Sequence, residues 1–225
     1  MIEGLEIAAE VWVLRTVETG RNTGVILGES GSTVVDPGAE TEEINAVDRF
    51  MVDMESKVEA VAFTGNVDVL PFIAKWPEAS AIPHSDLGIA HPAAPGWEMT
   101  PLNDTGRMGL YSKKSRIIFC GDMLRSDTIP NLKSGLDGYL EALDRIEALD
   151  IKVVVPLYGV EARGKREIKA RIEQDRSYTL SLLRHVATAR AANAPLERVL
   201  AVAEQVYEDY PHLQAHLRNI EYAWS

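Results

Sequence analysis

The spacing of hydrophobic and polar positions divides the first half of the chain into short strands and two helices. Apolar runs bounded by turn residues predict strands at 10–17, 23–30, 32–38, 58–64 and 80–85. Apolar residues at helical spacing predict helices over 39–55 and 68–76. The first three strands follow one another through short turns, so they form an antiparallel meander.

The second half begins with a segment of weak periodicity. Prolines and glycines are dense from 92 to 109, which predicts a loop that crosses to a second sheet. The pattern then resumes and predicts a hairpin at 108–122, a helix at 138–150, a buried strand at 151–159 and helices at 166–193, 195–210 and 212–225. This order gives two sheets with helices outside them, a layered α/β arrangement.

Composition and charge narrow the class of protein. A chain of 225 residues with 46% hydrophobic and 25% charged residues is typical of a globular protein with one large core. Its net charge of −11 repels phosphate backbones and anionic membrane surfaces, so we expect no nucleic-acid or membrane partner. No apolar run approaches the length of a membrane-spanning helix.

The single cysteine, Cys120, excludes an intrachain disulfide and a four-cysteine zinc site. Glu3, Glu6 and Glu10 interrupt the apolar residues at the N-terminus, so no secretory signal is expected there. A reducing compartment fits both observations, and we expect a cytoplasmic protein.

Four ordered segments carry a resemblance to a known family: NTGVILGESGSTVVDPGA, AVAFTGNVDVL, IIFCGDML, and PNLKSGLDGYLEALDRIEALDIKVVVPLYG. Their order and spacing resemble the metallo-β-lactamase superfamily from about Val11 to about Leu183. The resemblance implies a four-layer αββα sandwich with its active site along one sheet edge. We expect a single domain over 1–225, with extra C-terminal helices at 195–225 as an extension.

The resemblance also shows where metal ligands should stand and do not. The motif Thr-His-x-His-x-Asp-His corresponds to residues 64–70, TGNVDVL, and Pro-Gly-His-Thr corresponds to a stretch with Asn103 at the histidine position. The terminal Pro-Gly-His-Gly is replaced by 156–159, PLYG, which puts Tyr158 at the last histidine. Only the bridging carboxylate, Asp122, is kept, and one carboxylate holds a divalent metal weakly.

We therefore expect no metal and no other cofactor, and a cleft around Asp122 that has lost its metal. The resemblance implies that this cleft is lined by Asn66, Val67, Asp68, Leu70, Asn103, Cys120 and Tyr158.

Individual side chains have alternative interpretations. Tyr158 either fills the metal's volume and donates a hydrogen bond to Asp122, or contacts a ligand at the pocket mouth. Asn103 could donate to the same carboxylate. We expect Asp36 to cap backbone amides in its turn, and Cys120 to act as a small buried hydrophobe.

Histidines give no ligand pattern by themselves. His84 and His91 lie seven residues apart on an irregular segment, and His212 and His216 lie one turn apart on a predicted helix. We expect all four to face solvent. Apolar residues of the last helix pack either on the sandwich or on a second subunit, and the second alternative would give a homodimer through the C-terminal helices.

Three functions remain open. The first is a catalytically silent binding or scaffold protein, with a small molecule as its expected partner. The second is a hydrolase of thioesters, lactones or other esters, with one divalent zinc, iron or manganese ion at a rearranged site that uses Asp122, Asp68, Asp104 and His84 or His91. The third is a metal-free sensor whose cleft accepts an apolar ligand.

Overall fold

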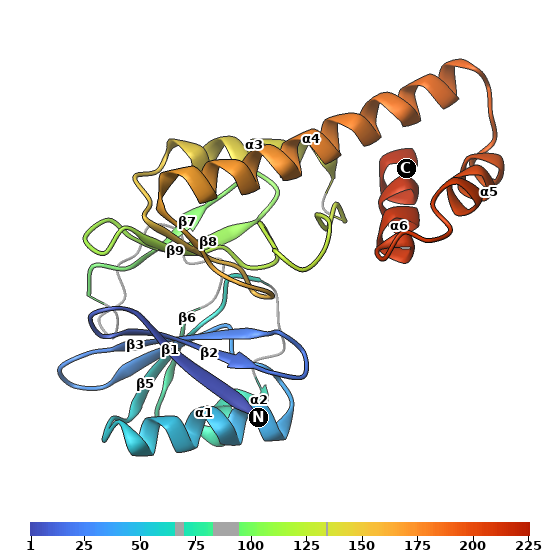
Figure 1. Cartoon of the computed structure of the whole chain (residues 1–225). Coiled ribbons are helices and arrows are strands. Elements are labelled where there is room, and N and C mark those ends of the chain that lie inside the picture. Colours follow the sequence, from blue (N-terminus) through green and yellow to red (C-terminus); the bar gives the residue numbers. More distant parts are fainter. Residues whose placement is uncertain (66–69, 83–94, 134) are drawn as a thin grey trace.

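The computed structural model describes residues 1–65, 70–82, 95–133 and 135–225. Its strands form two sheets (Figure 1). The six-stranded sheet has the order of the chain, with β1 (Ile2–Ala8), β2 (Val11–Thr16), β3 (Asn22–Leu27), β4 (Ser32–Val35), β5 (Val58–Ala62) and β6 (Ser80–Ile82). The five-stranded sheet has the order β11 (Ala162–Arg163), β10 (Val153–Val155), β9 (Ile117–Phe119), β8 (Met108–Ser112) and β7 (Glu98–Pro101).

Strands β1 to β4 form the predicted antiparallel meander, and β5 and β6 then continue the sheet in parallel. In the other sheet β9 and β10 pair in parallel, while β7, β8 and β11 are antiparallel to their neighbours. The helices are α1 (Thr41–Asp53), α2 (Leu70–Lys75), α3 (Leu136–Ala148), α4 (Gly164–Ala191), α5 (Leu196–Val206) and α6 (Leu213–Trp224).

Side-chain alternation along the strands produces four layers. In β4, Val34 packs toward α1 and α2, whereas Val35 packs between the sheets. In β9, Phe119 faces the space between the sheets and Ile118 faces α3 and α4. Both sheets are therefore buried on two faces, and helices cover the outer face of each (Figure 1). The αββα sandwich predicted from the sequence is confirmed.

The C-terminal helices pack against the chain itself. Helix α4 extends past the sheets, and α5 and α6 lie beside its far half (Figure 1). Leu217 and Ile220 of α6 join Leu182 and Val186 of α4 in the cluster that covers the five-stranded sheet. The apolar face of α6 is thus used within the chain, and the homodimer stays a prediction. None of the described helices has the length and apolarity needed to cross a bilayer.

Three strands were missed in the sequence. β1 is an edge strand whose residues are mostly exposed, so it lacks the apolar alternation of a buried strand. β7 lies inside the segment predicted as a loop, and Met99 is its one buried residue. β11 has only two residues.

Candidate functional site

A cleft of about 430 Å³ lies where several strands end. Its described walls include Asp36 just after β4, Thr64 after β5, the segment 120–123 after β9 and Leu157 after β10. The remaining lining residues are Arg21, Gly65, Gly106, Arg107, Met108 and Lys133. This position is the sheet edge at which the sequence predicted a functional site.

Asp36 supports the cleft from within the protein. Its carboxylate is buried and accepts hydrogen bonds from Thr64 N, at 2.8 Å, and from Thr64 Oγ1, at 2.6 Å. Burial raises the pKa of Asp36, while the hydrogen bonds from Thr64 act in the opposite direction. The predicted capping role agrees with this geometry. Gly121 packs against the same threonine, since a Cβ there would lie 2.8 Å from Thr64 Oγ1.

Asp122 is paired with an arginine. Arg107 Nη1 donates to Asp122 Oδ1 at 2.5 Å, and Asn131 Nδ2 donates to Oδ2 at 3.1 Å. The Arg107 side chain is 9% exposed and also donates to Asn131 O at 2.8 Å. Both oxygens of Asp122, the carboxylate that matches a metal-ligand position of the family, therefore accept hydrogen bonds from the protein. The guanidinium of Arg107 balances its charge.

Asn103 holds the turn that presents Arg107. Its Oδ1 accepts from the backbone N–H groups of Thr105, at 3.0 Å, and Arg107, at 2.9 Å, and its Nδ2 donates to Gly138 O. The donors to Asp122 are Arg107 and Asn131, and the NH2 group of Asn103 bonds to Gly138 O instead, so the structure does not show the donation to Asp122. Asn103 acts on the cleft indirectly, through the backbone of Arg107.

Arg107 packs against a buried polar pair, Tyr139 and Asp175. The guanidinium carbon of Arg107 is 5.1 Å from the centre of the Tyr139 ring. The Tyr139 hydroxyl donates to Asp175 Oδ2, and both residues are buried. Burial raises the pKa of Asp175 to about 6 and that of Tyr139 well above its usual value. The Arg107–Asp122 pair is thus supported, through the contact of Arg107 with the Tyr139 ring, by a buried polar pair from α3 and α4.

Tyr158 does not reach Asp122 in the way proposed from the sequence. Its hydroxyl accepts a hydrogen bond from Arg21 Nη1 at 3.1 Å, and the guanidinium of Arg125 stacks 4.5 Å from its ring centre. Arg21 also donates to the backbone oxygens of Asp36 and Pro37. The two cations hold the phenol beside the cleft, so Tyr158 orients Arg21 instead of filling the metal's place.

Of the other residues predicted to line the cleft, one does so, one lies on the surface and three are outside the described residues. Cys120 lines the cleft with a buried thiol whose pKa is raised by burial, which suits a small hydrophobe. Leu70 is 69% exposed at the start of α2 and is not among the lining residues, because the helix turns it outward. Asn66, Val67, Asp68, His84 and His91 lie outside the described residues.

Asn219 connects the last helix to the segment 130–132, which lies beside the cleft. This buried side chain donates to Pro130 O at 2.8 Å and accepts from Leu132 N at 3.2 Å. Those two residues flank Asn131, which binds both members of the Arg107–Asp122 pair. Helix α6 therefore fixes the segment that holds the charged pair in place.

His212 and His216 are partly buried and contact other side chains, so the prediction that they face solvent holds only in part. His216 is half-buried, and its Nδ1 lies 2.9 Å from the Tyr178 hydroxyl, among further tyrosine rings. Burial lowers the pKa of His216. His212 Nδ1 lies 3.3 Å from Thr128 Oγ1. Both histidines join α6 to the rest of the chain.

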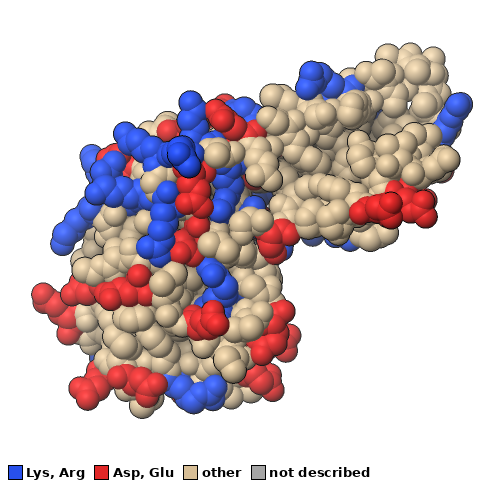
Figure 2. All heavy atoms as spheres, viewed as in Figure 1, with Lys and Arg blue, Asp and Glu red and all other residues tan. Residues whose placement is uncertain are grey.

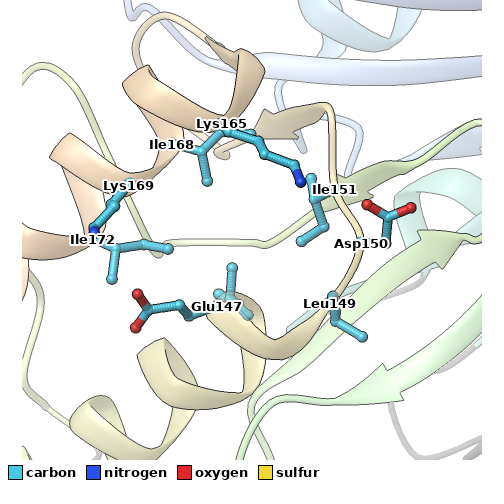
Figure 3. Close-up of a pocket in the computed structure, with 9 residues that line it drawn as sticks. Glu147, Leu149, Asp150, Ile151, Lys165, Ile168, Lys169 and Ile172 are labelled. Atoms are coloured by element: carbon cyan, nitrogen blue, oxygen red, sulfur yellow. The ribbon is translucent and has the colours of Figure 1, made fainter.

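A second hollow of about 230 Å³ lies on the outer surface between the end of α3 and the start of α4 (Figure 3). Ile168 and Ile172 form part of its floor, and Lys165 projects across it. Its two acids are already paired, Glu147 with Arg176 and Asp150 with Arg116. It lies at the opposite end of β10 from the cleft, since Ile151 precedes that strand and Leu157 follows it.

The donor set of the cleft does not fit a metal of the kind the family uses. In the parts of the chain that are described, no three His, Cys, Asp or Glu side chains come together as a metal site. Asp104 pairs with Arg145 and is not among the lining residues. A buried thiol and an arginine-paired carboxylate are poor ligands for zinc or iron.

Comparison with known proteins identifies the architecture. The family model described as the metallo-beta-lactamase superfamily matches residues 81–157. A metallo-β-lactamase from Erythrobacter litoralis aligns with a TM-score of 0.65 at 12% identity, over 78% of this chain and 92% of that one. The metallo-β-lactamase FIM-1 from Pseudomonas aeruginosa, in a mono-zinc form, aligns with a TM-score of 0.62 at 11% identity, over 79% and 96%. This chain has the metallo-β-lactamase fold.

The chemotaxis sensor ODP from T. denticola, in its apo state, shares the metallo-β-lactamase fold with a TM-score of 0.54 at 12% identity, over 78% of this chain and 93% of that one. The search among curated proteins finds no match. The predicted resemblance to the superfamily is confirmed.

Sequence reasoning missed Arg21, Arg107, Asn131 and Lys133, which supply the charge and hydrogen bonds of the cleft. Arg107 lies four residues past Asn103 in the turn where a histidine was sought. The sequence held a signal for Arg107, because a carboxylate kept in a cleft that has lost its metal ligands favours a basic side chain as its partner.

Proposed function

We propose that this protein is a metal-independent, catalytically silent binding protein built on the metallo-β-lactamase fold. The observation that carries the proposal is the pairing of Asp122 with Arg107, supported by Asn131. A metal at this carboxylate would have to displace a guanidinium that is 9% exposed and stacked on Tyr139. The positive charge of Arg107 would also repel the incoming ion.

The cleft itself favours a binding role. Its volume of about 430 Å³ falls in the range of small-molecule sites. Met108, Met123 and Leu157 contribute apolar wall, and charged groups stand beside them. Sensing is one form that such binding takes, and one neighbour with this fold is described as a chemotaxis sensor.

The hydrolase alternative has less support. Of the ligands proposed for its rearranged site, Asp122 is held by Arg107 and Asp104 is paired with Arg145 outside the cleft. Its other proposed ligands are outside the described residues. The experiment below separates this alternative from metal-independent binding.

Elemental analysis of protein purified without chelator tests the proposal. We expect well under about 0.1 zinc, iron or manganese ion per chain, since one arginine-paired carboxylate holds such ions weakly. The matched variant is Asp122→Asn, which keeps the size of the side chain and removes its charge. About one ion per chain in the wild type, lost in this variant together with ester hydrolysis, would establish the hydrolase instead.

The proposal also places the protein in the cytoplasm, with a small molecule and no nucleic acid as partner. The free, buried Cys120 supports a reducing compartment. The net charge of −11 opposes binding to polyanions.

A further inference from the structure

The charges of the described residues that line the cleft do not cancel. These residues include three basic side chains, Arg21, Arg107 and Lys133, and two acidic ones, Asp36 and Asp122. The described lining therefore has an excess of one positive charge in a chain whose net charge is −11. On the visible face, basic side chains gather over the layer of the five-stranded sheet, and acidic ones border the other layer (Figure 2).

The two acids of the cleft are already satisfied. Asp122 accepts from Arg107 and Asn131, and Asp36 accepts twice from Thr64. Each carboxylate oxygen already accepts from a protein donor, so a cationic ligand would compete with these donors. A positively charged small molecule would have to break one of these pairs.

The basic groups, in contrast, keep unused capacity. Among the described residues, Arg21 donates hydrogen bonds to uncharged oxygens alone, the Tyr158 hydroxyl and the backbone oxygens of Asp36 and Pro37. Lys133 is exposed at the rim and has no acidic partner among the described residues. A ligand anion could bind to the guanidinium of Arg21, which hydrogen bonds hold in place, and to the exposed ammonium of Lys133.

Apolar side chains line the cleft beside these basic groups. Met108, Met123 and Leu157 lie in the same cleft, and Gly65 and Gly106 leave open space where a side chain would otherwise project. A molecule with an apolar body therefore finds contact area there as well as charge.

We propose that the cleft binds a small organic acid, with an apolar body against the methionines and a carboxylate or phosphate group between Arg21 and Lys133. This inference rests on the proposed function, since it names the ligand class of the same metal-independent cleft. An anion in this place gains charge-assisted hydrogen bonds, which are stronger than neutral ones.

Calorimetric titration of the full chain with three matched probes tests the inference. Phenylacetate and phenylacetamide have the same shape and differ in charge, and phenyl phosphate replaces the carboxylate by a phosphate. We expect the better of the two anions to bind at least about tenfold more tightly than the amide, because a hydrogen bond to a charged group is stronger than one to a neutral group. The preferred anion then shows which acid group the cleft recognises.

Lys133→Ala supplies the second arm, since an exposed lysine can be removed without disturbing the core. It should weaken anion binding about tenfold and leave the amide unchanged. The matched control is Lys152→Ala, another exposed lysine that is not among the lining residues, and it should leave all three affinities unchanged.

Equal binding of amide and anions, absence of binding by all three probes, or equal effects of the two lysine variants would overturn the inference. Amide binding by protein that holds no metal would leave the proposed function standing while this ligand class fails. Stoichiometric metal in the same sample would instead remove the proposed function.

Discussion

At the residue scale, Asp175 makes stability depend on pH. Its pKa of about 6 in the folded protein exceeds the value of roughly 3.9 expected for an unfolded chain. The folded state therefore holds this proton more tightly, and the contribution to stability present at low pH is lost as pH rises from about 4 to about 6. Asp175→Asn keeps an acceptor for Tyr139 and removes the titration. In urea unfolding, we expect the stability of the variant relative to wild type to rise by about 1 to 2 kcal/mol between pH 4.5 and 7. A stability difference between variant and wild type that does not change with pH would contradict the assignment.

At the element scale, helix α6 holds the cleft through Asn219. Asn219→Ala leaves the buried groups Pro130 O and Leu132 N without their partner. We expect the free energy of unfolding to fall by about 1 to 3 kcal/mol and amide hydrogen exchange of 131–133 to accelerate. Gln214→Ala, at an exposed position of the same helix, is the control and should change neither. Normal protection of the 131–133 amides in the Asn219 variant would show that α6 does not fix this segment.

At the scale of the whole molecule, the C-terminal helices share buried contacts with the sandwich. Leu217 and Ile220 share one buried cluster with side chains of α3 and the five-stranded sheet. We therefore expect scanning calorimetry to show one cooperative transition, and removal of 195–225 to lower its midpoint by several degrees. Two separate transitions in the full chain, with the larger one unchanged by the truncation, would show that the extension is independent.

Much of the fold was predictable because alternation and helical spacing are properties of short segments. The buried strands β3, β4, β5 and β10 and the long helices α1, α3 and α4 have strong local patterns. The missed β1 is an exposed edge strand, and β7 contains one buried residue. Such strands are stabilised by pairing with a neighbour, and that pairing has no local signal.

The site divides in the same way. The sequence by itself determined which metal ligands are absent and which carboxylate, Asp122, remains, because these are matters of residue identity at motif positions. Only the tertiary structure decided what occupies the cleft. Arg107, Asn131 and Lys133 reach it from loops outside the motif strands, and Asn219 holds one of these loops from the far end of the chain. Charge pairing depends on distances between residues remote in sequence, and those distances are set by the packing of the layers.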